Sequence, residues 1–294
     1  MRVTQSMLTN NMLKNLSRSY SNLDKYSDQL STGKKVNRPS DDPVVAMKGM
    51  NYRSQLTEVE QFQRNLGEVY NWMDNSDSAL DKATQALQRL RELAVQASNG
   101  TYEENQRESI AKEVDQLKEH LIDIANTKVN NKYIFNGTDT KNAPLTVDSV
   151  TGIIATSGTT NPVMIEVSGG TKLQANINPQ NVFTDQLFAD INEFLNALKS
   201  DNVANVQAAI GNLDTHIDNT VNERADLGAR MNRLELIENR LAEQEVIATR
   251  TMSDNEDIDI EKVIVALTSQ ESIHRAALSG GSRIIQPTLL DFLR

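Results

Sequence analysis

The sequence of 294 residues contains no cysteine, few aromatic residues and no long apolar run. The absence of thiols excludes disulfides, thiolate zinc sites and cysteine nucleophiles. The longest continuous apolar stretch, residues 263–267, is far shorter than the roughly 18 residues that a transmembrane helix requires. The N-terminal residues contain neither a continuous apolar segment nor a small-residue cleavage site. We therefore expect no cleaved secretory signal and no association with a membrane.

Composition excludes one class of partner and favours one kind of core. The net charge is −10, and the two basic clusters, Lys34–Lys35–Arg38 and Arg89–Arg91, are short and followed by acidic residues. Because phosphate binding needs a concentrated basic patch, we expect no nucleic-acid partner. A hydrophobic fraction of 38% with only 4% aromatic residues favours narrow seams between helices over a thick globular core.

Both ends of the chain carry thin apolar seams at heptad-like spacing. Alternating steps of three and four place such residues on one face of a helix. Ser27 interrupts the N-terminal seam, and Glu271 and His274 weaken the C-terminal one. We therefore expect terminal helices that are weak alone, with seams that serve as subunit interfaces rather than as core. The candidate interface residues on these seams are Leu13, Leu16, Tyr20, Leu23, Leu30, Ile264, Leu267, Leu278, Ile285, Leu289, Phe292 and Leu293.

The middle of the chain has stronger patterns. Residues 59–97 follow a strict apolar heptad, residues 103–131 carry a second seam, and the short connection between them predicts an antiparallel hairpin. Residues 138–181 contain segments rich in Val, Ile and Thr that are bounded by Gly, Asn and Pro, which is typical of short strands and turns. Helical spacing then resumes over residues 182–252.

These patterns predict a mainly α fold: a long antiparallel helical bundle or coiled coil with a small antiparallel β insertion in the middle of the chain. The expected divisions are residues 1–40, 41–137, 138–181, 182–252 and 253–294. We expect the first and last of these, the assembly helices, to be mobile in the monomer.

A polar corner at residues 33–43 predicts the end of one helix and the start of the next. Gly33 is the usual residue just past a helix end. Asp42 occupies an N-cap position with Pro43 as the first helical residue, where its missing N–H costs nothing.

The acidic residues at 254–259 could hold calcium loosely, but they lack the glycine and the twelfth-position glutamate of an EF-hand. We favour helix capping, because Ser253 and Glu256 fit a capping box and acidic residues suit a helix start.

No motif in the sequence points to catalysis. His120, His216 and His274 lie far apart in helical patterns without an HExxH motif, so we interpret them as solvated or partner-facing. The sequence also lacks phosphate-binding, dinucleotide-binding and nucleophile-elbow motifs. We therefore predict no enzymatic activity, no metal and no cofactor.

The sequence resembles the bacterial flagellin family over about residues 1–137 and 222–294. The segments that carry the resemblance are residues 1–4 (MRVT), 30–43 (LSTGKKVNRPSDDP), 91–100 (RELAVQASNG), 133–137 (YIFNG) and 223–235 (ERADLGARMNRLE). Two details favour a junction-type member of the family over a filament-forming one. Pro43 stands where filament-forming flagellins tend to have alanine, and residues 282–293 (SRIIQPTLLDFL) lack the flagellin-type ending.

The resemblance implies an extracellular structural subunit of the flagellum whose paired terminal helices build an inner tube and whose middle faces outward. It implies export through the flagellar type III channel without a cleaved signal peptide. The implied partners are another hook-associated protein on the hook side, flagellin on the filament side, copies of the chain itself in a ring, and a cytoplasmic export chaperone at the C-terminal end.

The resemblance also gives the polar corner a candidate role. Lys34, Lys35, Arg38, Asp41 and Asp42 become candidate contacts with neighbouring subunits, against the alternative of a solvated capping loop. Three other functions stay open: a short flagellin that forms the filament itself, an enzyme carried in the insertion, and an intracellular coiled-coil scaffold. The enzyme is disfavoured because residues 138–181 contain no histidine.

Overall fold

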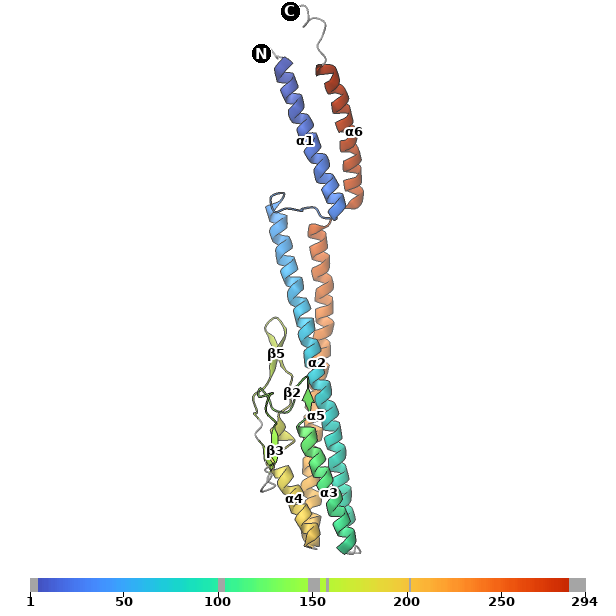
Figure 1. Cartoon of the computed structure of the whole chain (residues 1–294). Helices are drawn as coiled ribbons and strands as arrows, with labels where there is room; N and C mark the ends of the chain where they lie inside the picture. Colours follow the sequence, from blue (N-terminus) through green and yellow to red (C-terminus); the bar gives the residue numbers. More distant parts are fainter. Residues whose placement is uncertain (1–4, 100–103, 148–153, 157–158, 201, 286–294) are drawn as a thin grey trace, which may run out of the picture. The chain divides into compact units, whose positions relative to one another are not determined.

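The computed structural model describes residues 5–99, 104–147, 154–156, 159–200 and 202–285 (Figure 1). The described helices are α1 (Gln5–Thr32), α2 (Pro43–Ser98), α3 (Glu104–Ala125), α4 (Asp185–Lys199), α5 (Val203–Glu256) and α6 (Ile260–Ile285), with a 3-10 turn, η1 (Pro179–Asn181). The strands are β1 (Lys128–Val129), β2 (Lys132–Tyr133), β3 (Leu145–Val147), β4 (Ile154–Thr156), β5 (Met164–Ser168) and β6 (Thr171–Gln174). The predicted mainly α fold with a small β insertion is confirmed.

The strands form three separate antiparallel hairpins, β1–β2, β3–β4 and β5–β6. Two of them lie in the predicted insertion, but β1–β2 replaces the predicted helical end at residues 126–131. The cause is local: Asn130 and Asn131 both have positive φ, of 50° and 65°. Asparagine tolerates this conformation, and two such residues in succession suit a two-residue hairpin turn.

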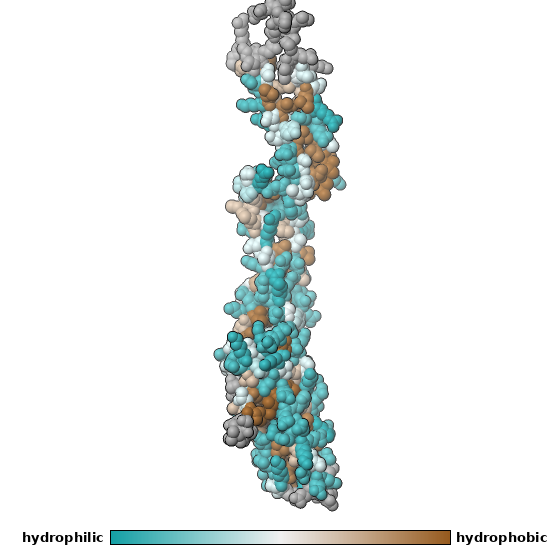
Figure 2. Space-filling model, in the orientation of Figure 1, coloured by the Kyte–Doolittle hydropathy of each residue, from teal (hydrophilic) through white to brown (hydrophobic). Residues whose placement is uncertain are grey.

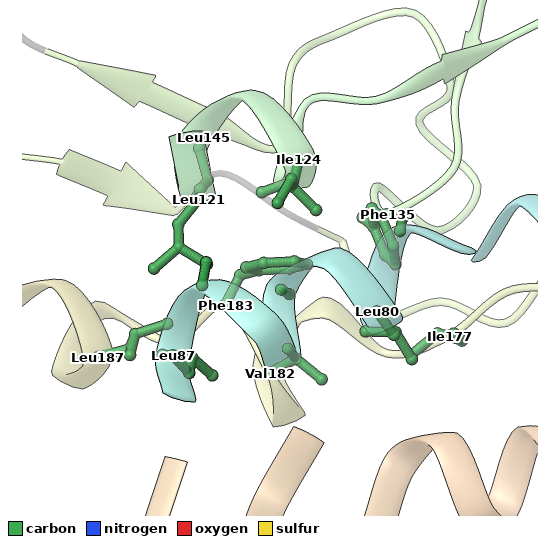
Figure 3. Close-up of a cluster of buried hydrophobic side chains, with 14 of the residues drawn as sticks. Leu80, Leu87, Leu121, Ile124, Phe135, Leu145, Ile177, Val182, Phe183 and Leu187 are labelled. Carbon is green, nitrogen blue, oxygen red and sulfur yellow. The ribbon is translucent and has the colours of Figure 1, made fainter. Parts of the chain in front are cut away.

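The chain divides into two compact units, which we call the terminal unit (residues 1–58 and 244–294) and the central unit (residues 59–243). Among the described residues, every buried apolar side chain belongs to the central unit, from Leu66 to Leu241. Figure 3 shows part of this core, a cluster of buried side chains that includes Leu80 and Leu87 of α2 and Leu121 and Ile124 of α3. The central unit therefore has the apolar core that a stable helical domain needs.

Two aromatic residues of this core, Phe135 and Phe183, come from loops beside the helices, whereas Trp72 belongs to α2 and Phe188 and Phe194 belong to α4. Phe135 and Phe183 are both fully shielded, and their rings meet edge to face with centroids 5.2 Å apart (Figure 3). Edge-to-face pairs of this kind add to the stabilisation that burial alone gives. Through these two rings, the loop after β2 and the loop before α4 pack against the same core.

One core hydroxyl has no partner. Ser76 lies on the apolar seam of α2 with its side chain fully buried, and its Oγ makes no hydrogen bond with any described residue. We expect Ser76→Ala to leave the free energy of unfolding unchanged or to raise it by about 1 kcal/mol, because an unpaired buried hydroxyl is unfavourable. Urea denaturation measures this.

The matched comparison is Thr220, a buried residue of α5 whose Oγ1 donates to the carbonyl oxygen of His216 at 2.8 Å. We expect Thr220→Val to lower the free energy of unfolding by about 1 kcal/mol, since that bond is lost. A loss in Ser76→Ala as large as that in Thr220→Val would contradict the assignment of Ser76 as unpaired.

The interpretation of the histidines as solvated or partner-facing is wrong for His216. Its ring is buried, with Nε2 at 2.8 Å from Oδ2 of Asp190 on α4, whose Oδ1 accepts from the side-chain amide of Gln186 at 2.7 Å. Periodicity places His216 on a helix but does not show that α4 covers it. His120 is exposed, in line with the interpretation.

Candidate assembly interface

The terminal unit is built from α1, α6, the start of α2 and the end of α5. Within it α1 and α6 lie side by side (Figure 1). In its described part, the residues shielded from solvent are Ser19, Gly49, Glu256 and Gly281, none of which has a large apolar side chain. The helix pair thus leaves its apolar side chains in contact with solvent.

The predicted seam residues fall into three groups. Leu13, Tyr20, Leu30, Ile264 and Leu278 are mainly exposed, with Tyr20 at 68% and Leu13 at 52% of their full accessibility. Leu16, Leu23 and Leu267 are half-buried. Ile285 is the last residue of α6, and Leu289, Phe292 and Leu293 lie outside the described residues.

The terminal unit has further exposed apolar residues outside the predicted seams. Brown patches of hydrophobic side chains lie on the outside of the terminal helices in Figure 2. The additional exposed residues are Met7 and Leu8 on α1, Val44, Met47 and Met50 on α2, Val246 and Ile247 on α5, and Ile260, Val265 and Ile273 on α6. Sequence reasoning missed the α2 group, although its spacing of three residues places it on one helix face.

A groove of about 520 Å³ runs between α1 and α6, lined by Leu13, Leu16, Ser17, Tyr20, Ser21, His274 and Leu278. Its floor is polar. The Oγ of Ser19 accepts a hydrogen bond from the side-chain amide of Gln270 at 3.0 Å and lies 3.3 Å from Nδ1 of His274. The rings of Tyr20 and His274 pack in a T-shaped arrangement with centroids 5.7 Å apart. Polar contacts of Ser19 with Gln270 and His274 therefore join α1 and α6 alongside their half-buried apolar residues.

The polar corner has the capping that the sequence predicts. Helix α1 ends at Thr32 and Gly33 has a φ of +70°. Helix α2 begins at Pro43, and Oδ1 of Asp42 accepts the N–H groups of Val44 and Val45 at 3.0 and 3.2 Å.

The other candidate contact residues of the corner are either exposed or bound to another part of the same chain. Oδ2 of Asp41 accepts the N–H of Arg38 at 3.1 Å, and both side chains are exposed. Lys34 and Lys35 instead bind the end of α5 in the same chain.

We expect Asp42→Ala to speed hydrogen exchange at the amides of Val44 and Val45 about fivefold, because losing an N-cap costs about 1 kcal/mol. Asp41→Ala is the control, since its carboxylate does not accept from the first turn of α2. Equal exchange rates at Val44 in the two variants would contradict the capping role of Asp42.

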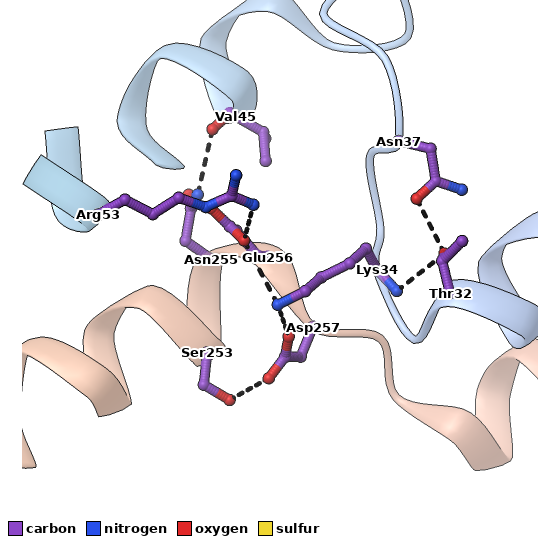
Figure 4. Close-up of polar contacts among 9 residues, drawn as sticks. All are labelled: Thr32, Lys34, Asn37, Val45, Arg53, Ser253, Asn255, Glu256 and Asp257. Atoms are coloured by element: carbon purple, nitrogen blue, oxygen red, sulfur yellow. Dashed lines mark hydrogen bonds and ion pairs between the residues drawn. The ribbon is translucent and has the colours of Figure 1, made fainter. Parts of the chain in front are cut away.

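A cluster of polar contacts joins the segment after α1 to the segment after α5 (Figure 4). We call it the clasp: residues 33–35, Arg53 and residues 253–258. Two backbone hydrogen bonds form its frame, from the N–H of Lys35 to the Glu256 carbonyl at 2.6 Å and from the N–H of Ile258 to the Gly33 carbonyl at 3.0 Å.

Side chains complete the clasp. Oε2 of Glu256 lies 2.6 Å from Nη2 of Arg53 on α2 and 3.4 Å from Nζ of Lys34. Asp257 accepts from Nζ of Lys34 at 2.6 Å and from the hydroxyl of Ser253 at 2.5 Å. Glu256 is only 8% exposed, so this carboxylate is buried and paired with two cations.

These contacts shift the ionisation of the clasp. The hydrogen bond from Arg53 is the main cause that holds the pKa of Glu256 below its ordinary value, with a smaller contribution from Lys34. The hydrogen bond from Lys34 is the main cause that lowers the pKa of Asp257, and the same bond raises the pKa of Lys34. In the folded chain these contacts therefore stabilise the charged forms of Glu256, Asp257 and Lys34.

The predicted capping box at Ser253 and Glu256 is wrong. Both residues belong to the last turn of α5, and α6 begins at Ile260, with Oδ1 of Asp259 accepting the N–H of Lys262 at 3.2 Å. The reason is competition: the Glu256 carboxylate meets Arg53 and Lys34 instead of a backbone N–H.

The described residues contain no helix long and apolar enough to cross a membrane. In the same part of the chain, no group of three or more histidine, cysteine, aspartate or glutamate side chains is placed to hold a metal ion.

Comparison with known proteins places both ends of the chain in one family. Residues 3–140 match the bacterial flagellin N-terminal helical region, and residues 210–293 match the bacterial flagellin C-terminal helical region. These ranges include the segments that carry the resemblance in the sequence, except for Met1 and Arg2.

Full-length relatives agree with these matches. The chain is 27% identical over 300 residues to flagellar hook-associated protein 3 of Escherichia coli (strain K12), covering 94% of this chain and 95% of that protein. It is 30% identical over 261 residues to the flagellar filament 31.3 kDa core protein of Treponema maltophilum, covering 85% of this chain and 84% of that protein.

Its fold is similar to the crystal structure of flagellar hook associated protein-3 from Legionella pneumophila, with a TM-score of 0.65 and 17% identity over 70% of this chain and 98% of that chain. With its two helical ends matched and a 30%-identical relative covered over most of its length, this chain belongs to the bacterial flagellin family.

Proposed function

We propose that this chain is a structural subunit of the bacterial flagellum that joins the hook to the filament and has no catalytic role. The observation that carries the assembly role is the terminal unit, in which α1 and α6 keep many of their apolar side chains exposed although the central unit has a full core. An apolar surface of this kind is typical of a subunit interface that is covered on assembly.

The junction role, rather than a filament role, is supported by the relative named flagellar hook-associated protein 3, which the chain matches over almost its whole length. Pro43 in the corner and the sequence of residues 282–293 also favour the junction role.

In this role the chain acts outside the cell after export through the flagellar type III channel. Its neighbours are another hook-associated protein on the hook side, flagellin on the filament side and copies of itself in a ring, and a cytoplasmic chaperone binds its C-terminal end before export. The proposed interface comprises Leu13, Leu16, Tyr20, Leu23, Leu30, Arg38, Asp41, Asp42, Ile264, Leu267, Leu278, Ile285, Leu289, Phe292 and Leu293.

A filament-forming flagellin is the second candidate, and the relative that favours it is the flagellar filament 31.3 kDa core protein. The two roles differ in self-assembly. A filament subunit polymerises alone into long filaments, whereas a junction subunit stays monomeric or stops at a short ring. Electron microscopy of the purified chain under conditions that polymerise flagellin distinguishes them.

Deleting the gene tests the junction role directly. We expect cells with complete hooks, no filaments and flagellin released into the medium, and we expect the intact gene to restore filaments. Filaments of normal length in the deletion strain would contradict the proposal, and so would cells that still hold flagellin inside.

A further inference from the structure

We propose that Asn136 is a site of spontaneous deamidation that reacts while the chain is unfolded and is closed once the central unit folds. The observation that carries this proposal is an asparagine–glycine pair whose side-chain amide is buried and hydrogen-bonded at both ends. All of these contacts lie within the central unit, so the proposal does not rest on the junction role.

The chemistry depends on the residue after the asparagine. The backbone nitrogen of Gly137 attacks the side-chain amide carbon of Asn136 and forms a C–N bond, and the amide nitrogen leaves with the Gly137 proton as ammonia. Water then opens the cyclic imide to aspartate or isoaspartate, so the reaction consumes water and transfers no electrons. Glycine permits the attack because no side chain crowds its nitrogen. The sequence contains two such pairs, at residues 99–100 and 136–137.

The folded chain holds the Asn136 amide in an arrangement that opposes this reaction. Asn136 is fully shielded from solvent, its Oδ1 accepts the N–H of Thr159 at 2.9 Å, and its Nδ2 donates to the Asn142 carbonyl at 2.8 Å. Imide formation removes the amide nitrogen and pulls the side chain onto the backbone, which breaks these hydrogen bonds inside a buried site. Deamidation in the folded protein therefore requires local opening of the fold.

The backbone of the pair is also constrained. Gly137 has a φ of +53°, and a Cβ at this position would collide with the carbonyl oxygen of Thr159 and lie 2.7 Å from that of Asn161. The hydroxyl of Thr159 donates to the Asn136 carbonyl at 2.8 Å. The fold thus requires glycine at the position where glycine makes the unfolded chain reactive.

Deamidation before folding would loosen the β3–β4 hairpin. Asn142 precedes β3 and Thr159 follows β4, so Asn136 ties both ends of this hairpin to the core beside Phe135. An aspartate has no N–H to donate to the Asn142 carbonyl and places a charge in a buried site, which is unfavourable. A chain that is deamidated at Asn136 therefore keeps its helical core but holds the insertion less firmly.

Mass spectrometry of the full-length protein tests the site. The protein is kept at mildly alkaline pH in native buffer and, in parallel, in guanidinium chloride that unfolds the central unit, and the tryptic peptide of residues 133–141 is followed over time. We expect conversion of Asn136 to be about a hundredfold slower in native buffer, because only locally open molecules react. Asn99, which is exposed after α2 and is also followed by glycine, is the reference and should be converted in both conditions.

Thr159→Val tests whether the hydrogen bonds around Asn136 slow the reaction. The variant keeps the side-chain volume but removes the hydroxyl that binds the Asn136 carbonyl. We expect conversion in native buffer to become about fivefold faster, as for the loss of one neutral hydrogen bond. Thr160→Val changes the exposed neighbouring threonine and is the matched control, which should leave the rate unchanged.

Asn136→Asp imitates one product of the reaction. We expect hydrogen exchange at the Leu145 amide of β3 to become about tenfold faster while circular dichroism still reports the helices. Asn131→Asp, at an exposed turn position, is the control and should leave this exchange unchanged. Equal conversion of Asn136 in native buffer and in guanidinium chloride would overturn the proposal. So would exchange at Leu145 that is the same in the two aspartate variants.

Discussion

Leu13→Asp combined with Leu278→Asp should abolish incorporation of the chain into the flagellum and leave the unfolding of its central unit unchanged within about 0.5 kcal/mol. Both leucines line the groove between α1 and α6 and are about half exposed in the monomer, so a charge there costs the free chain little. In an assembled interface the same charge would be buried without a partner, which costs several kcal/mol.

The measurements are urea denaturation of the purified protein and motility of cells that carry the variant gene. Asn15→Asp with Ser279→Asp provides the matched control, because these are exposed polar positions on the same two helices. Normal motility with the leucine variants would show that this face does not meet a partner. A loss of several kcal/mol in the central unit would show that the seam belongs to the core.

Phe183→Ala should lower the free energy of unfolding of the central unit by about 3–5 kcal/mol. The Phe183 side chain is 2% exposed and meets Phe135 edge to face, so its removal takes away both buried area and an aromatic pair and leaves a cavity. Chemical denaturation followed by circular dichroism measures the loss.

The control for this variant is Leu236→Ala in the same unit, because Leu236 is 71% exposed and its truncation should change the free energy by less than about 0.5 kcal/mol. Similar losses at Phe183 and Leu236 would contradict the division into a buried core and an exposed surface. A marginal loss at Phe183 would mean that the core tolerates cavities.

Much of this architecture can be read from the sequence, because its signals are local. The heptad at residues 59–97 predicts a long helix, and α2 continues through it to Ser98. Gly33, Asp42 and Pro43 predict the corner correctly, since a helix stop and an N-cap depend on a few neighbouring residues. The β insertion follows from the change of composition after residue 137.

The clasp could not be predicted, because its partners are distant in the sequence and its signal is ambiguous. Glu256 lies in an acidic run that looks like the start of a helix, and only the tertiary contacts with Arg53 and Lys34 distinguish the two interpretations. The interpretation of His216 as solvated or partner-facing was wrong for the same reason, because the residue that contacts its ring, Asp190, lies on another helix. Local patterns show where a side chain lies on its helix but not which element packs against it.

The central claim is that the terminal unit gains its stability from assembly while the central unit is stable by itself. Hydrogen exchange of the monomer, resolved by residue, tests it most directly. The account predicts slow exchange for the helices within residues 59–243 and fast exchange for α1 and α6, with protection of α1 and α6 appearing only in the assembled flagellum. Protection of α1 and α6 in the free monomer equal to that of α2 between Leu66 and Ala97 would contradict it.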